Sequence, residues 1–169
     1  RLTRDFLPAE GTVSFDFPDV SLLAALAGQK AEGSINGDMA LATRNGTTSL
    51  EAKASGSVES AGAALQKLSL ALSMPDIKAI AVDGKLTAAR AGTASAAVEN
   101  LSLDIAHGGD TTQVNLNGRY DNAPLALKGS IQQVENAISL RLDALNAAPK
   151  GIAVRLAQPA TIAVKDGTA

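Results

Sequence analysis

LQKLSLALS (residues 65–73) and ENLSLDIAH (residues 99–107) carry the pattern that decides the fold of this chain. In both stretches leucine or isoleucine recurs at every second position, with polar or small residues between. Successive side chains of a β-strand point to opposite faces of the sheet, so this spacing predicts strands with one apolar face. The same alternation recurs in QVNLNG (113–118), APLALKGSI (123–131), AISLRLDA (137–144), GIAVRLA (151–157) and TIAVKD (161–166).

Length and composition predict a folded chain with an unusual interior. Of the 169 residues, 46% are hydrophobic and 19% are charged, which fits a globular protein and argues against disorder. Aromatic residues make up only 2%, so the apolar surface must consist of leucine, isoleucine, valine and alanine. Such a surface lacks the large rings that usually anchor protein interfaces.

Charge and cysteine content exclude several classes of function. The net charge is −2, and lysine and arginine are scattered singly, so nucleic-acid binding has little electrostatic support. The chain has no cysteine, which excludes disulfides and thiolate metal sites. No apolar run reaches the ~18 residues of a membrane-spanning helix.

One short helix is predicted near the N-terminus. Residues 10–17 alternate as a strand, and residues 19–27, DVSLLAALA, then show helical spacing of leucines. Asp19 is suited to cap the first turn, and Gly28 is suited to end the helix.

The rest of the chain is predicted to be strand. Asn45-Gly46 between two alternating runs is a strong hairpin signal, and the other breaks fall at proline, glycine or Asp-Asn pairs. The connections are too short for helical crossovers, so neighbouring strands should be antiparallel. Glycines inside strands, at 37, 56, 84, 118 and 129, predict bulges or bends. The predicted strands are 32–43, 47–58, 64–73, 77–89, 94–106, 111–120, 123–132, 136–144, 151–157 and 160–166.

The predicted sheet is too wide for the helix to cover. About ten strands ~4.8 Å apart give a sheet roughly 45 Å wide, whereas a nine-residue helix is about 14 Å long. The sheet must therefore fold into a sandwich, close into a barrel, or curl into a trough occupied by another apolar molecule. An alanine-rich interior with almost no aromatic residues suits acyl chains as well as it suits self-packing.

DVSLLAALAG (19–28) followed by AEGSINGDMALA (31–42) resembles the repeating unit of the TamB family, which belongs to the AsmA-like group of periplasmic β-groove proteins in Gram-negative bacteria. RYDNAPLALKGSI (119–131) and RLAQPATIAVKDGTA (155–169) are similar to later parts of the same pattern. The resemblance covers most of the chain and rests on leucine and glycine patterning.

This resemblance implies an all-β fold, a long antiparallel curled sheet with an open apolar groove. It also implies phospholipid movement between the inner and outer membranes, and partnership of the full-length protein with an outer-membrane barrel of the Omp85 type in outer-membrane biogenesis. Residues 1–169 would be a single segment of this groove. The chain begins at Arg1 without an initiator methionine, which predicts a fragment of a longer, membrane-anchored periplasmic protein.

The alternating aliphatic residues are the predicted groove lining. Small inward residues such as Ala52, Ala54 and Ala88 would leave room for the lipid tails. The predicted lining consists of Ile35, Met39, Leu41, Leu50, Leu68, Leu70, Leu72, Ile80, Val82, Leu86, Leu101, Leu103, Ile105, Val114, Leu116, Leu125, Leu127, Ile138, Leu140, Leu142, Ile152, Val154, Ile162 and Val164.

No catalytic, metal or cofactor site is predicted, and the chain is not expected to be an enzyme. His107 is the only histidine and is placed in a turn, His107-Gly108-Gly109-Asp110, without an oriented partner or nucleophile. The aspartates lie in or near predicted turns, where they suit turn capping, and their spacing matches no calcium loop.

Two other readings remain open from the residues alone. The chain could be a structural or adhesive module, such as a sandwich or β-solenoid, whose closed core is filled by its own side chains, although irregular strand spacing disfavours a solenoid. It could also be a scaffold that templates strands of outer-membrane proteins. Unpaired edge strands would allow such templating, and they would equally allow self-association.

Overall fold

The computed structural model describes residues 10–26, 28–78, 81–134 and 137–165, and shows one 11-stranded sheet with one short helix. The predicted all-β antiparallel class is confirmed. The elements are β1 (Gly11–Phe17), α1 (Ser21–Leu26), β2 (Ala31–Arg44), β3 (Thr47–Ser60), β4 (Ala63–Met74), β5 (Asp83–Thr93), β6 (Ala97–Gly108), β7 (Thr111–Tyr120), β8 (Ala123–Val134), β9 (Ala137–Ala147), the 3-10 turn η1 (Pro149–Gly151), β10 (Val154–Arg155) and β11 (Ala160–Lys165).

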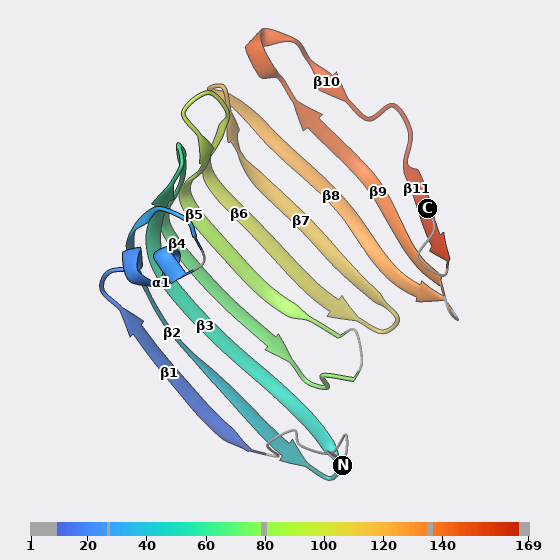
Figure 1. Cartoon of the computed structure of the whole chain (residues 1–169). Coiled ribbons are helices and arrows are strands. Elements are labelled where there is room, and N and C mark those ends of the chain that lie inside the picture. The colour runs from blue at the N-terminus through green and yellow to red at the C-terminus, as the bar shows by residue number, and fades with distance from the viewer. Residues whose placement is uncertain (1–9, 27, 79–80, 135–136, 166–169) are drawn as a thin grey trace.

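The sheet is a meander that curls without closing. From β1 to β9 each strand pairs with the next one along the chain, and β10 and β11 both pair with β9. The described strands at the two ends of this order, β1 and β10 with β11, do not pair with each other. Figure 1 shows the resulting curved, open sheet, with α1 beside one end of β1 and β2.

Two-residue hairpins produce the meander. Asn45 and Gly46 connect β2 to β3 with φ values of 52° and 79°, and Asp121 and Asn122 connect β7 to β8 with φ values of 53° and 60°. Positive φ at both central residues is the type I′ geometry, which matches the twist of the flanking strands. A third such hairpin, with Ala61 at φ 43° before a glycine, joins β3 to β4 and was not predicted, because alanine carries no turn signal.

Ala61→Asn is expected to raise the free energy of unfolding by about 0.5–1 kcal/mol. Alanine strains at positive φ, whereas asparagine tolerates this conformation and is favoured at the first position of a type I′ turn. Asn45→Ala, at the equivalent position of the first hairpin, should lower stability by a similar amount. Urea unfolding of both variants checks the pair, and an equal shift in the same direction would contradict the turn assignment.

The helix begins and ends where the sequence predicts, to within two residues. The backbone N–H of Ser21 donates to Oδ1 of Asp19 at 2.8 Å, which lowers the pKa of this carboxyl below its usual value of 3.8. At the other end Gly28 has φ 68°, its N–H bonds the carbonyl of Ala25, and the N–H of Gln29 bonds that of Ala24. This is a Schellman ending, which requires the left-handed conformation that glycine adopts without strain.

Two predicted strands are shorter than expected. The strand predicted over 77–89 begins only at Asp83, because Pro75 cannot donate to a ladder and Asp76 instead accepts a bond from the N–H of Lys78 at 2.9 Å. The strand predicted over 151–157 is reduced to the two residues of β10. There η1 starts at a proline, Lys150 has φ 52°, and its N–H donates to Oδ2 of Asp121 at 2.6 Å, which holds this segment in a turn.

The strand glycines differ in their roles. Register shifts occur beside Gly56, between it and Val58, and at Gly129, as predicted. A third shift, between Glu99 and Ser102 of β6, lies opposite the segment of β7 that contains Gly118. At residues 37 and 84, where bulges or bends were predicted, the register is regular, so neither glycine marks a bulge.

Hardly any side chain in the described part of the chain is buried. Of the described residues only Val20, Ala88, Thr112 and Gly129 are buried, and no large side chain among them is fully buried. A sandwich or barrel of this size would enclose many leucines, so the described residues form no closed, dry core. Within the same residues, no helix has the length and hydropathy needed to cross a membrane.

Candidate functional site

One row of leucines crosses the middle of the sheet. In antiparallel pairs, residues directly opposite each other project from the same face, so the strand register shows which side chains are neighbours. Leu70 of β4 lies opposite Leu86, and the row continues strand by strand to β9. We call Leu70, Leu86, Leu103, Leu116, Leu127 and Leu145 the leucine row. With ~4.8 Å between strands it is about 24 Å long.

Parallel rows extend this surface to every strand. The leucine row continues toward β1 through Ala54, Gly37 and Phe15. The leucine row and its neighbours together are called the apolar face, and none of its residues is charged. The row on one side of the leucine row consists of Val13, Met39, Ala52, Leu72, Gly84, Ile105, Val114, Gly129 and Leu142. Farther out on this side lie two shorter rows: Leu41, Leu50 and Met74, and Ile131, Leu140 and Ile162. The row on the other side consists of Phe17, Ile35, Gly56, Leu68, Ala88, Leu101, Gly118, Leu125, Ala147 and Val154.

The opposite face of the same strands is polar. Next to the leucine row, the register aligns a row of hydroxyl and amide side chains: Asn36, Ser55, Ser69, Thr87, Ser102 and Asn117. Charged residues also lie on this face, where Nζ of Lys85 is 3.2 Å from Oδ1 of Asp104 in the neighbouring strand. One face of the sheet therefore suits water, and the other does not.

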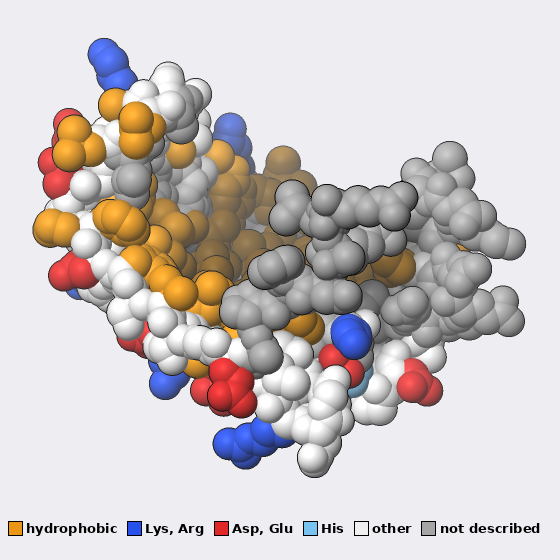
Figure 2. All heavy atoms as spheres, turned by 60° about the horizontal axis from the view of Figure 1, so that its bottom comes forward, with side chains coloured by type: hydrophobic (Ala, Val, Ile, Leu, Met, Phe, Trp, Pro, Cys, Tyr) orange, Lys and Arg blue, Asp and Glu red, His pale blue; other side chains and the backbone are white. Residues whose placement is uncertain are grey.

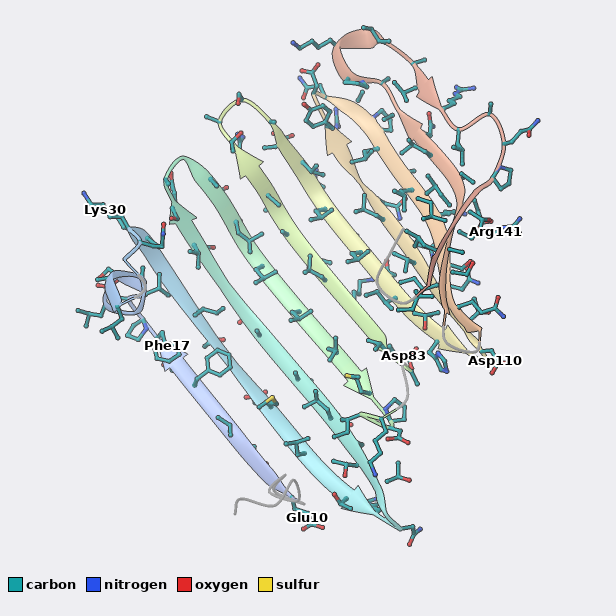
Figure 3. All side chains as sticks on the ribbon, turned by 45° about the vertical axis from the view of Figure 1, so that its right-hand side comes forward. Glu10, Phe17, Lys30, Asp83, Asp110 and Arg141 are labelled. Carbon is teal, nitrogen blue, oxygen red and sulfur yellow. The ribbon has the colours of Figure 1, made fainter. Side chains whose placement is uncertain are left out.

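The apolar face lines the inner side of the curl. Figure 2 shows hydrophobic side chains gathered in the hollow of the curved sheet, with acidic and basic side chains around its outside. Figure 3 looks onto the same face, where Phe17 lies at the end next to the helix. Exposure is greatest near the two edges of the sheet: Val13 is 56% exposed and Ile162 is 55% exposed. No second layer of described residues covers this face.

The helix does not cover the hollow either. The backbone N–H of Val20 donates to the carbonyl of Gly33 in β2 at 3.0 Å, and the Val20 side chain is buried there. Leu22 and Leu26, by contrast, are 76% and 87% exposed, so these two side chains of α1 do not pack against the sheet. The expectation that one short helix cannot cover the sheet agrees with this arrangement.

Most residues predicted as lining lie at strand positions of the apolar face. Val82 and Ile152 are exceptions, because both lie outside the strands for the reasons given above, and Ile152 is 68% exposed. Ile80 lies outside the described residues, and so does the side chain of Val164, whose backbone pairs with Ile138.

Other residues of the apolar face were missed by the prediction. Val13, Phe15 and Phe17 alternate in β1, a signal that was present but was assigned only to a strand. Leu145 was missed because the register shift at Lys128 and Gly129 brings it onto the same face as Leu142, three positions away. Strict alternation cannot predict such a shift.

His107 lies in β6 and not in the turn where it was predicted. It is half-buried, pairs with Thr112 of β7, and its Nδ1 is 3.2 Å from Oγ1 of that threonine. Its backbone N–H donates to Oδ1 of Asp83 at 2.8 Å. These contacts tie together the ends of three strands, β5, β6 and β7.

The described residues contain no group of three or more histidine, cysteine, aspartate or glutamate side chains that could hold a metal ion. Comparison of this chain with protein-family models, with curated proteins and with solved structures finds no match in any of the three.

Proposed function

We propose that this chain is a β-groove segment that shields the hydrocarbon chains of lipids from water and lets them move along the sheet. The observation that carries the proposal is the uncovered apolar face, which runs from β1 to β11 on the inner side of the curl. Burial of hydrocarbon against such a surface is favourable by roughly 0.8 kcal/mol for each buried CH₂.

The composition of the face favours hydrocarbon over a protein partner. Stable protein interfaces concentrate binding energy in tryptophan, tyrosine and arginine. The aromatic residues on the apolar side of the sheet are two phenylalanines at its β1 edge and Tyr120 at the end of β7. Its small positions, such as Gly37, Ala52 and Ala54, leave a shallow, smooth surface that a flexible acyl chain can follow.

The leucine row also explains how a groove could hold a lipid without trapping it. An acyl chain lying along the row contacts a leucine at every strand, so a shift of ~4.8 Å replaces each contact with an equivalent one. The energy therefore changes little from strand to strand. The hydrocarbon core of a bilayer is about 30 Å thick, and an acyl chain of one leaflet spans about half of it. The leucine row, about 24 Å long, is therefore longer than one acyl chain in a membrane.

The resemblance to the TamB family supplies the wider setting of the proposal. On that basis the parent protein would be anchored in the inner membrane, cross the periplasm, and deliver phospholipid to the outer membrane together with an Omp85-type barrel. The chain would work without a cofactor and without catalysing a reaction. The groove itself requires only the apolar face.

Native mass spectrometry of the chain, purified from cells without detergent, tests the proposal. We expect bound phospholipid, identified by lipid extraction, in clear excess over a water-soluble protein of similar size prepared in parallel. Lipid-stripped protein should regain this mass when it is incubated with phospholipid vesicles. Bare protein in both preparations would contradict the groove.

A further inference from the structure

The outer edge of β1 is a second surface of the sheet, and no strand of the described residues covers it. All seven residues of β1 pair with β2 without a register shift, and no described strand pairs with its other side. Natural edge strands avoid pairing with other chains by means of charged side chains, lysine above all, or of proline or a bulge. The sequence GTVSFDF contains no lysine, proline or bulge, and its one charged side chain is that of Asp16.

The opposite edge of the sheet offers a poorer surface. There the outer side of β9 is covered by two pieces, the two residues of β10 and the six residues of β11, with residues 156–159 between them. A head-to-tail contact of β1 with that edge would meet an interrupted strand. Pairing of β1 with β1 of a second copy is two-fold symmetric and stops at the dimer, so it forms no filament.

We propose that two copies of this chain pair through β1 in antiparallel register centred on Ser14. This register places Thr12 opposite Asp16 of the second copy and Val13 opposite Phe15, and it is the one that overlaps all seven residues while keeping both apolar faces on the same side. The inference goes beyond the proposed function, because it concerns the edge of the sheet and not its face.

The charges and exposed side chains of β1 suit this register. In this register each Asp16 lies opposite Thr12 of the second copy, so the two Asp16 residues are four positions, about 13 Å, apart along the strand. A register centred on Asp16 would instead place the two carboxylates directly opposite each other. Val13, which is 56% exposed, gains contact with an aromatic ring. The apolar faces of the two copies become continuous across the new strand pair. One strand pair buries less than a standard interface, so the dimer should be weak and depend on concentration.

Disulfide trapping of single-cysteine variants tests the register directly, because the chain has no cysteine of its own. In the proposed dimer the two Ser14 Cα atoms lie about 5 Å apart, within the range that a disulfide bridges, while the two Thr12 Cα atoms are roughly 14 Å apart. Ser14→Cys should form a covalent dimer under mild oxidation at least tenfold faster than Thr12→Cys, which is also exposed on the same strand. Thr161→Cys in β11 is the control for the opposite edge.

Sedimentation of the lipid-stripped chain provides a second readout. The unmodified chain should shift from monomer to dimer as its concentration rises, and Ser14→Lys should remain monomeric, because it places two like charges opposite each other. Equal cross-linking at residues 12, 14 and 161, or a monomer at every concentration, overturns the proposal. Lipid retention is measured separately, so loss of the dimer and loss of lipid binding are distinguishable.

Discussion

Replacing Leu70 by aspartate is expected to reduce lipid retention by about tenfold to a hundredfold. Leu70 lies between Ala54 and Leu86 in the middle of the apolar face. In the variant, the apolar contact of Leu70 with the acyl chain is replaced by a carboxyl group that has no polar partner there. A polar group buried without a partner costs about 1–3 kcal/mol, and each 1.4 kcal/mol changes an affinity tenfold. The retained lipid per protein, measured by native mass spectrometry, checks this result.

The neighbouring residue provides a matched control. Ser69→Asp introduces the same carboxyl on the same strand, but Ser69 lies in the polar row of the opposite face, between Ser55 and Thr87. We expect lipid retention to stay at the level of the unmodified chain. The pair therefore separates an effect of the apolar face from a general effect of added negative charge.

The same test applies at the far side of the groove. Leu140→Asp should abolish cross-linking to a photoreactive acyl chain, because Leu140 lies between Ile131 and Ile162 on the apolar face and is 45% exposed. The adjacent Arg141 points to the other face, where its Nε is 2.6 Å from Oδ1 of Asp143, so its replacement should leave cross-linking intact. Equal cross-linking in the variants at 69, 70, 140 and 141 would defeat the assignment of the groove face.

Gly56→Ala is expected to lower the free energy of unfolding by about 2–3 kcal/mol. A Cβ atom at this position would overlap the backbone oxygen of Ser34 and lie 2.8 Å from the Cα of Ile35, so β2 and β3 could not keep their spacing. Overpacking against a backbone that cannot move aside is costly. For a chain of this length we expect the melting temperature to fall by roughly 5–10 °C.

Gly84→Ala is the matched comparison, since Gly84 is also an apolar-face glycine inside a strand. There the nearest atoms to an added Cβ are the carbonyl oxygen of Ala71 at 3.3 Å and Cδ1 of Leu72 at 3.8 Å. A small adjustment accommodates the methyl group, and alanine lowers the entropy of the unfolded chain, so the change should stay within about 0.5 kcal/mol. Equal losses at both positions in urea unfolding would show that the contact with β2 is not the cause.

The fold was largely predictable because its determinants are local. Alternation indicated the strands, Asn45-Gly46 indicated a hairpin, and short connections indicated antiparallel neighbours, so a meander followed. The errors occurred where a tertiary contact overrides the pattern. The segment around Val82 alternates like a strand, but it leaves the sheet after a proline and an aspartate that bonds its own turn. Leu145 breaks the alternation yet joins the leucine row through a register shift.

By itself, the sequence determined which side chains share a strand face, because the two-residue period of a strand is a property of the backbone. It also determined that the rows of this face are apolar and uncharged, and mostly aliphatic. Only the tertiary structure decided that the described strands form an open sheet, that six leucines align across six strands, and that no described strand pairs with the outer edge of β1. Register and curvature depend on where hairpins, bulges and close backbone contacts fall relative to one another, and these relations join residues far apart in the chain.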